Sequence, residues 1–538
     1  MMPWIDHILI APIVLPLIAG AVMLLIEERR RGLKAGIGLS SIIGLTGIAI
    51  ILLYLTDASA QPLVYRLGNW PAPFAIVLVA DRLSAIMLLL TAVLALTSFT
   101  FSLARWHRAG SHFHSQFQFL LMGLNGAFLT GDLFNLFVFF ELLLAASYGL
   151  VLHGSGILRV RAGLHYIAIN LAASLLFLIG VSLIYSVTGT LNMADLAIRV
   201  SQLSPENRPL LEAGAAVLGI AFLVKAGIWP LCFWLPTTYA AAAPPIAAMF
   251  AIMSKLGIYV ILRLWLLLFG DDSGASAHFG SDWLLIGAIA TIVFGIIGAL
   301  ASQDMARLAS FTVLISSGTV LAAIAIGDVS VTGPALFYLV SSTMAIAAFF
   351  MLIELLERGR DPFADMLAVT REAYGEDEED EEDEIGVAIP ATVAILGICF
   401  MGCALVLAGL PPLSGFIAKF AILTALFNAP GADSSIAPVS WILLALLLVS
   451  GLMTLIAMTR AGIRTLWMPD ERVVSRVRVV EIVPIALLLL MSVTLTVRAE
   501  PAMRYMRATA SAIHTPSDYV QSVLAPTARP APKAGSLQ

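Results

Sequence analysis

Four ionisable residues interrupt long apolar stretches of this chain. They are Glu141 in NLFVFFELLLAASYGLV, Lys225 in LGIAFLVKAGIWP, Lys255 in MFAIMSKLGIYVIL and Lys419 in PPLSGFIAKFAIL. An ionisable group at the middle of a bilayer costs about 2.5–3.5 kcal/mol on insertion scales. A chain that carries four such groups is predicted to use them, and their chemistry indicates a buried path for protons or ions.

Glu141 and Lys225 have the chemistry of a proton switch. A carboxylate accepts a proton or stabilises a buried ammonium, and a buried ammonium separated from its carboxylate tends to release its proton. Moving the two side chains apart would therefore couple movement, or a change in electric field, to proton transfer. The alternative is a permanent structural ion pair in which Lys225 only neutralises Glu141.

Lys255 and Lys419 extend the series of buried amines. Lys255 has no acidic residue close to it in the sequence, which favours a relay in which water carries protons between groups. The alternative is that Lys255 reaches the membrane surface, but apolar residues flank it on both sides. Lys419 would end a line of titratable groups along the membrane midplane; the alternative is a lysine in a loop.

Apolar segments of membrane-spanning length must position these residues. The chain has 538 residues, of which 60% are hydrophobic and 12% charged, and its mean hydropathy is +0.95. Recurrent apolar segments of 18 or more residues predict an all-α polytopic membrane protein. We expect about fourteen transmembrane helices, near residues 8–26, 36–55, 82–103, 116–131, 133–152, 163–187, 212–231, 244–268, 282–301, 308–326, 333–356, 387–428, 437–459 and 480–497.

The seventh and twelfth spans are predicted to be broken helices. Glycine and proline lie beside the buried lysine in both, at Gly227 and Pro230 and at Pro411, Pro412 and Gly415. Such breaks free backbone groups that only protein or water can satisfy inside a membrane. Two broken helices, five spans apart and each with a lysine, indicate two inverted five-helix repeats.

This interpretation divides the chain into four parts. They are residues 1–110 with three spans, 111–270 with the first repeat, 271–460 with the second repeat, and 461–538 with the last span and a tail. A solvated acidic loop is expected at 376–384, a short amphipathic element on the outer surface at 191–211, and a disordered tail at 524–538. The excess of Lys and Arg in alternate loops predicts both termini on the external side.

Several other polar residues have weaker claims on the path: Asp132, His165, Arg263 and Ser317. His165 is expected to pack between helices, and Arg263 to extend toward the outer end of its span. A further group is spaced like metal ligands, but no acid or cysteine joins it, so a solvated loop is expected there: His107, His112 and His114. The sequence thus assigns no metal ligands.

Motifs for other functions are absent from the sequence. We find no P-loop, dinucleotide fingerprint, iron–sulfur cysteine series or haem motif, so no cofactor is expected. The few basic clusters lie beside spans and do not form a nucleic-acid footprint. Energy must therefore come from an ion gradient or from a partner chain.

At these residues the chain resembles the antiporter-like proton-channel subunits of respiratory complex I, membrane-bound hydrogenases and Mrp-type cation/proton antiporters. The segments GDLFNLFVFFELLLAASYGLVLHG, VTGTLNMADLA and VKAGIWPLCFWLPTTY are most similar to the D-type branch of the Mrp (Pha or Mnh) antiporter subunits. The resemblance implies that Glu141, Lys225, Lys255 and Lys419 are proton-path residues. Many relatives carry His or Gln near Ser317, where a serine could hold a water instead.

The resemblance also implies a function and partners. The chain would be a secondary transporter subunit, not an enzyme, in a multi-subunit complex that exchanges Na⁺ or K⁺ for protons. The proton-motive force would drive it in the bacterial cytoplasmic (inner) membrane, with a larger A-type paralogue and small hydrophobic subunits as partners. Two alternatives stay open: a proton-pumping subunit of a redox-driven complex, and a scaffold subunit that no longer conducts.

Overall fold

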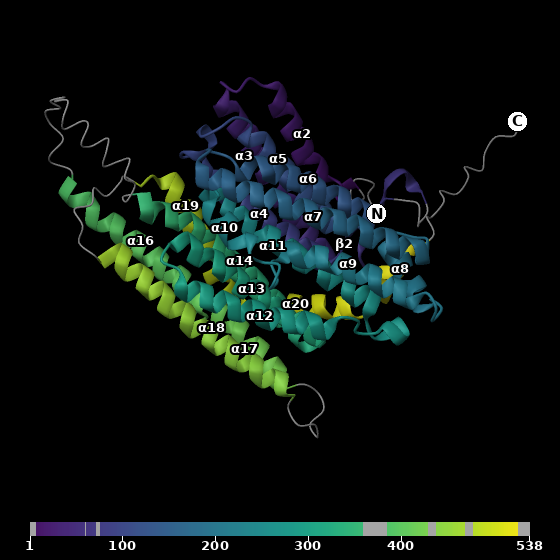
Figure 1. Ribbon diagram of the computed structural model, residues 1–538. Helices are drawn as coiled ribbons and strands as arrows, with labels where there is room; N and C mark the ends of the chain where they lie inside the picture. The colour runs from purple at the N-terminus through teal and green to yellow at the C-terminus, as the bar shows by residue number, and fades with distance from the viewer. Residues whose placement is uncertain are drawn as a thin grey trace, which may run out of the picture.

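The computed structural model describes residues 7–59, 61–70, 76–358, 385–428, 437–467 and 477–525. Over these ranges the chain is a bundle of long helices that lie side by side (Figure 1). The expected acidic loop at 376–384 and all but the first two residues of the expected tail at 524–538 lie outside the described residues. The bundle consists of α2 (Ala11–Leu25), α3 (Arg31–Ala58), α4 (Arg82–Ser102), α5 (Phe113–Leu129), α6 (Leu133–Val151), α7 (Ile157–Thr188), α9 (Arg208–Ala226), α10 (Trp234–Ala241), α11 (Pro244–Phe269), α12 (Ser281–Ala301), α13 (Met305–Ile326), α14 (Val329–Glu357), α16 (Ile385–Ala408), α17 (Ser414–Phe427), α18 (Pro438–Gly462) and α19 (Val479–Val497).

The prediction of an all-α chain with many membrane-spanning helices is confirmed. In the described part of the chain, eleven helices are long and apolar enough to cross a membrane, and each range expected for a span contains helix. Outer helices present apolar side chains, such as Ile43, Ile50 and Tyr54 on α3, which are 55, 54 and 75% exposed. Such a surface is stable only in contact with lipid or another apolar chain.

The centre of the bundle is formed by α4, α11 and α14, whose side chains are almost all buried. Helix α11 contacts α9, α13 and α14, and α14 in turn contacts α17. A helix that is apolar around its whole circumference has no preferred polar face and therefore occupies such a core. Polar side chains in the middle of α11 and α14 are consequently held away from the surface of this chain.

Both predicted helix breaks are present. Helix α9 ends at Ala226 and the chain resumes as α10, while α16 ends at Ala408 and resumes as α17. A left-handed glycine follows each first half, with φ of 73° at Gly227 and 76° at Gly409. A side chain with a Cβ rarely adopts this conformation, so glycine allows the turn that ends the first half of each broken helix.

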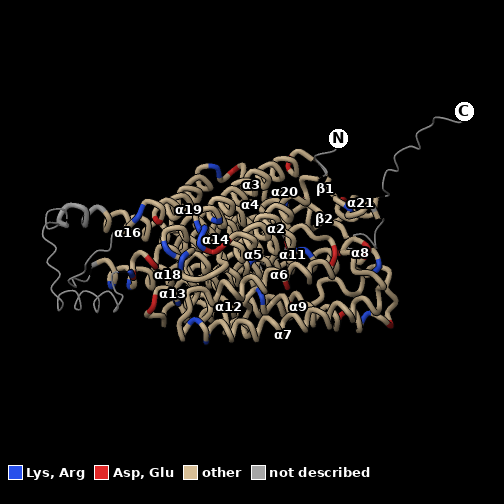
Figure 2. The backbone as a smooth tube through the Cα atoms, turned by 90° about the horizontal axis from the view of Figure 1, so that it is seen from above, with Lys and Arg blue, Asp and Glu red and all other residues tan. Residues whose placement is uncertain are grey.

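A small cap lies at one end of the bundle (Figures 1 and 2). It contains the antiparallel strands β1 (Leu63–Arg66) and β2 (Val77–Ala80) and the amphipathic helices α8 (Met193–Ser201) and α21 (Ser517–Leu524). Helix α8 confirms that a short amphipathic element occupies the polar segment at 191–211. Single turns complete the described structure: η1 (Leu67–Asn69), η2 (Trp106–Arg108), η3 (Asp271–Ser276) and the π-helical η5 (Ile463–Trp467).

The sequence interpretation missed α20 (Ala499–His514), which packs along α14 and contacts α4 and α11. Its mean hydropathy is too low for a span, but Met503, Met506 and Ile513 lie on one face and are buried. An amphipathic helix of this kind covers the core with its apolar stripe. The charged residues of the chain gather mostly around the outline of the bundle, with a few among the central helices (Figure 2).

Candidate functional site

Lys255 lies at the centre of the bundle on α11, with none of its side chain exposed. Its ammonium donates hydrogen bonds to the hydroxyl oxygens of Ser316 (2.8 Å) and Ser317 (3.1 Å), both on α13. The predicted burial of Lys255 is therefore correct, and it does not reach the membrane surface. Ser316 and Ser317 bind the lysine directly, so two hydroxyls stabilise an ammonium that has no carboxylate partner in the described structure.

A series of hydrogen bonds continues from Ser316 to α14, away from Lys255. Ser316 Oγ lies 2.8 Å from Ser342 Oγ on α14, and Ser342 donates its single proton to the carbonyl oxygen of Tyr338 at 2.7 Å. Because a hydroxyl has only one proton to donate, Ser316 is the donor in the contact between the two serines. The hydrogen bonds thus run in one direction, from Lys255 through Ser316 to Ser342.

A cavity of about 10 Å³ adjoins Ser316 and Ser342. Its other walls include Gly415 on α17 and Thr454 on α18. This volume is about that needed to hold one water molecule, and the lining hydroxyls supply hydrogen-bond partners for it. Gly415 lies one helical turn before Lys419 on α17, so the cavity separates the serine series from the helix that carries Lys419.

Lys419 is a buried residue of α17 and not a loop lysine. Its side chain is 7% exposed, and its ammonium donates to the carbonyl oxygen of Ala408, the last residue of α16, at 3.1 Å. Unpaired carbonyls at a helix C-terminus carry partial negative charge, which favours a cation there. A Cβ at Gly409 would lie 2.7 Å from the Lys419 side chain, so glycine leaves the space that the lysine occupies.

Lys225 and Glu141 lie on α9 and α6, and α9 packs directly against α11, the helix of Lys255. Lys225 is 5% exposed at the end of α9, and its ammonium lies 4.9 Å from the centre of the Phe140 ring. Glu141, the next residue on α6, is half-buried and acts electrostatically on Lys225. However, neither Lys225 Nζ nor the buried Oε1 of Glu141 has a hydrogen-bond partner within the described residues. The two groups are close enough to influence each other but do not form a locked pair.

Helices α9 and α11 cross closely between the two inner lysines. A Cβ at Gly257 would lie 2.7 Å from the backbone nitrogen of Ala226, the residue after Lys225. No hydrogen bond in the described structure links Lys225 to Lys255. A proton that passes between them needs water or a side-chain movement.

A second cavity, of about 440 Å³, opens beside the central helices. Tyr239, Ala247 and Phe350 line it together with charged residues, which include Arg105, Arg159, Glu354 and Arg358. This cavity is large enough for several water molecules. It brings solvent toward α10 and α11, the helices next to the break after Lys225.

Comparison with known proteins now identifies the family. Residues 130–444 match the family model described as "NADH:quinone oxidoreductase/Mrp antiporter, TM". The chain belongs to this family. Along its full length it is 59% identical to a Rhizobium meliloti (strain 1021) protein named as the D subunit of a probable K(+)/H(+) antiporter, which it also covers completely.

Two further comparisons agree with this assignment. An Alkalihalophilus pseudofirmus protein named as the D subunit of a Na(+)/H(+) antiporter is 34% identical over 96% of this chain and 99% of its own length. A chain in the solved Mrp complex from Dietzia sp. DQ12-45-1b superposes with a TM-score of 0.81, covering 97% of this chain and 100% of its own. At 23% identity this last similarity establishes the fold alone.

Asp132 and His165, two of the weaker candidates, lie at a helix end and on an exposed helix face. Asp132 is the N-cap of α6 and accepts from the backbone N–H of Asn135 at 2.9 Å. Burial raises the pKa of the Asp132 carboxyl above its usual value. His165 does not pack between helices as expected, because it is exposed on α7 and lines a surface recess.

The histidines between α4 and α5 are not all in a solvated loop, which corrects the prediction. His107 and His114 are buried, with ring centres 5.6 Å apart, and only His112 is exposed. Burial, together with nearby Arg108, lowers the pKa of His107 below its usual value. Among the described residues no group of three or more His, Cys, Asp or Glu side chains is placed to hold a metal ion.

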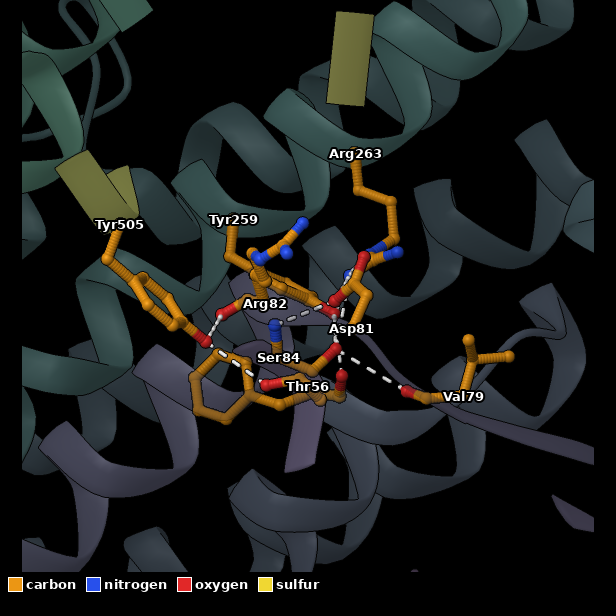
Figure 3. A network of polar contacts seen from close by, with 9 residues as sticks. Thr56, Val79, Asp81, Arg82, Ser84, Tyr259, Arg263 and Tyr505 are labelled. Atoms are coloured by element: carbon orange, nitrogen blue, oxygen red, sulfur yellow. Dashed lines mark hydrogen bonds and ion pairs between the residues drawn. The ribbon is translucent and has the colours of Figure 1, made fainter. Parts of the chain in front are cut away.

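Arg263 does not extend to the membrane surface; it is held in a buried ion pair (Figure 3). Its guanidinium donates to both carboxylate oxygens of Asp81, at 2.8 and 2.9 Å, and to the hydroxyls of Ser84 and Tyr259. Burial alone would raise the pKa of Asp81, but the charge and hydrogen bonds of Arg263 lower it below its usual value. The network ties α11 to the start of α4, so a structural role explains Arg263.

Replacing Arg263 with methionine is expected to destabilise the protein by about 3–5 kcal/mol, because it leaves the Asp81 carboxylate buried without its partner. The double variant Arg263→Met, Asp81→Asn should recover part of the lost stability, because residue 81 no longer carries a buried charge without a partner. Thermal unfolding of the purified protein in detergent measures both effects. An Arg263→Met protein with unchanged thermal stability would contradict the structural role.

Proposed function

We propose that this chain is the D-type subunit of a multi-subunit monovalent cation/proton antiporter, and that it carries the proton path. One observation carries this proposal. The chain is 59% identical to a protein named as the D subunit of a probable K⁺/H⁺ antiporter, and the alignment covers 100% of both chains. The buried lysines and the serine series described above supply groups suited to proton transfer. The family description by itself covers both redox complexes and antiporters, so identity rather than fold favours the antiporter.

In this proposal Glu141 and Lys225 form the switch at one end of the path. Glu141 is half-buried on the surface of this chain, where a partner subunit or water can exchange a proton with it. Movement of Glu141 away from Lys225 leaves a buried ammonium stabilised only by the Phe140 ring, which favours loss of its proton. Return of the carboxylate favours protonation again.

Lys255 and its serines form the middle of the path. Lys255 gives a proton to Ser316 as Ser316 gives its own to Ser342, so each hydroxyl accepts one proton and releases one. Before this transfer Ser342 must rotate its hydroxyl from the Tyr338 carbonyl toward a water in the 10 Å³ cavity, so that it releases its own proton to that water as it accepts one from Ser316. Lys419 receives the proton beyond that cavity, and water bridges the step between Lys225 and Lys255.

The architecture proposed for this function has fourteen spans. Helices α5 to α11 and α12 to α18 would be the two inverted repeats, with the α9–α10 and α16–α17 breaks in corresponding positions. The similar glycine turns after α9 and α16 support this pairing. We place both termini on the external side of a bacterial inner membrane, as the distribution of Lys and Arg predicts.

The cation is proposed to be K⁺, because the relative with 59% identity is named for K⁺ and the one with 34% for Na⁺. Partner subunits would include a larger A-type paralogue and small hydrophobic subunits, and part of the cation route would lie in them. The test uses everted membrane vesicles from an antiporter-deficient bacterium that expresses the whole subunit set. Addition of K⁺ should collapse the pH gradient, and omission of this chain should prevent the collapse.

The redox-driven alternative predicts a different result in the same vesicles. A complex that pumps protons when NADH or another reductant is added, with no response to K⁺ or Na⁺, would contradict the antiporter proposal. A scaffold subunit predicts full K⁺ response from a complex in which Glu141 is changed to alanine. Since these outcomes are distinct, one set of vesicles separates all three functions.

Replacing Ser316 with alanine is expected to slow transport by about tenfold or more, because a hydrogen bond to a charged group is worth about 1.5–3 kcal/mol. The variant breaks the link from Lys255 to Ser342 and leaves Ser317 to hold the ammonium. Initial rates of K⁺-induced pH change, normalised to assembled complex, measure the effect. Ser310→Ala on the same helix is the matched control, since among the described residues the Ser310 hydroxyl donates only to the backbone carbonyl of Ala306. Equal rates for Ser316→Ala and Ser310→Ala would exclude Ser316 from the path.

A further inference from the structure

A recess of about 970 Å³ opens on the surface where four helices meet. The start of α7, the end of α10, the end of α12 and the start of α13 form its walls, and α10 contacts both α7 and α13. The polar residues that line it include Arg161, His165, Thr237, Ser302, Asp304 and Arg307. No step of the proton path described above uses these residues.

The recess carries net positive charge. Arg161 and Arg307 are exposed, and neither forms an ion pair within the described part of the chain. Asp304 is the acid in the lining, but its carboxylate caps α13 by accepting from the backbone N–H of Ala306 at 2.9 Å. Two guanidinium groups thus face the recess against one carboxylate, and His165 lies one turn beyond Arg161 on the same face of α7.

The surroundings place the recess at a membrane boundary. Helix α7 begins at Ile157 and α13 at Met305, so both arginines lie in the first two turns of apolar helices. Ile157, Leu158 and Leu164 are 89, 80 and 61% exposed beside Arg161. The lining also includes apolar surface, at Gly298 and Phe311. A ligand that fits must have an anionic head and an apolar tail.

We propose that this recess binds an anionic phospholipid, with its phosphate between Arg161 and Arg307 and an acyl chain against Phe311. Guanidinium groups bind phosphate oxygens in paired, charge-assisted hydrogen bonds, and basic pockets between membrane helices are suited to anionic headgroups. The membrane supplies such lipids at the depth of the recess. The proposal does not depend on which cation is transported.

The bound lipid would brace α10, the helix that follows the break after Lys225. The headgroup would contact α7 on one side and α13 on the other. It would therefore link the two helices between which α10 packs. An acidic segment of a partner subunit is the competing occupant. The exposed apolar side chains of Ile157 and Leu158 beside the recess favour lipid. An acyl chain bound there would cover them together with the acyl chains of the surrounding bilayer.

The test measures lipid binding to the purified complete complex. After delipidation in detergent, phosphatidylglycerol or phosphatidylcholine is added and bound lipid is counted by native mass spectrometry. We expect phosphatidylglycerol to bind preferentially, and the double variant Arg161→Gln, Arg307→Gln to weaken its binding roughly 30-fold through loss of two charges at headgroup level. Arg504→Gln, which removes an exposed arginine of α20 outside the recess, should leave binding unchanged.

Two further measurements keep the outcome decisive. Ala301→Trp narrows the recess from an exposed position without changing charge, and should also weaken phosphatidylglycerol binding. Size-exclusion chromatography confirms that each variant is assembled. Unchanged phosphatidylglycerol binding in the double variant overturns the proposal, and loss of a partner subunit with lipid binding retained assigns the recess to a subunit interface instead.

Discussion

Replacing Lys255 with methionine should abolish K⁺-coupled proton transport, reducing the rate at least a hundredfold. Methionine fills nearly the same volume in the core, so the packing of α11 against α13 and α14 is retained. What is lost is the one titratable group that donates to both Ser316 and Ser317. With no proton carrier at the centre of the bundle, the two ends of the path are disconnected. The measurement is K⁺-induced collapse of a pH gradient in everted vesicles, per assembled complex.

The control for this variant is Lys34→Met. Lys34 is also a fully buried lysine, at 1% exposure, but it pairs with Glu28 at the start of α3 and lies outside the proposed path. Transport should survive in Lys34→Met complexes that assemble. Near-normal transport by the Lys255→Met complex would show that protons do not pass through Lys255.

Replacing Glu141 with glutamine should reduce transport by at least tenfold while the complex still assembles. Glutamine keeps the shape of the side chain but removes the charge that acts on Lys225. Within the described part of the chain, Lys225 then keeps only the Phe140 ring as a stabilising contact for its ammonium, so the protonation cycle of the switch is lost. Glu141→Asp keeps the charge on a shorter side chain and should retain part of the activity.

A matched control distinguishes this effect from a general cost of removing a membrane carboxylate. Glu212 on α9 is also half-buried, but it accepts a hydrogen bond from Ser276 at the opposite end of α9 from Lys225. Glu212→Gln should transport at close to the wild-type rate. If the Glu141 and Glu212 variants are impaired equally, the switch assignment is wrong.

Local patterns in the sequence were enough to predict the long apolar helices and their breaks, although not the amphipathic helix α20. A span needs only a run of apolar residues, and a break needs only glycine and proline within it, so both signals lie within a few residues of the feature that they determine. Burial of Lys255 and Lys419 followed for the same reason, because apolar neighbours on both sides exclude water whatever the tertiary arrangement.

Features that depend on distant contacts were not predictable. Arg263 is 182 residues from Asp81 along the chain, and nothing near either residue indicates the pair. His165 and His114 show the same limit, since the side of a helix that faces the bundle is decided by which helices pack against it. For Ser342 a signal was available: the polar group SST at 341–343 interrupts an apolar segment, as Lys255 does.

A connected proton path across this chain requires water between Lys225 and Lys255, because no hydrogen bond within the described residues joins the two lysines. The most direct test is a structure of the complete complex in lipid, at a resolution that locates ordered water. We predict water molecules that join Lys225 to Lys255 and a water in the cavity between Ser342 and Gly415. A dry, apolar barrier between the two lysines, in a map that shows ordered water elsewhere in the bundle, would contradict the path.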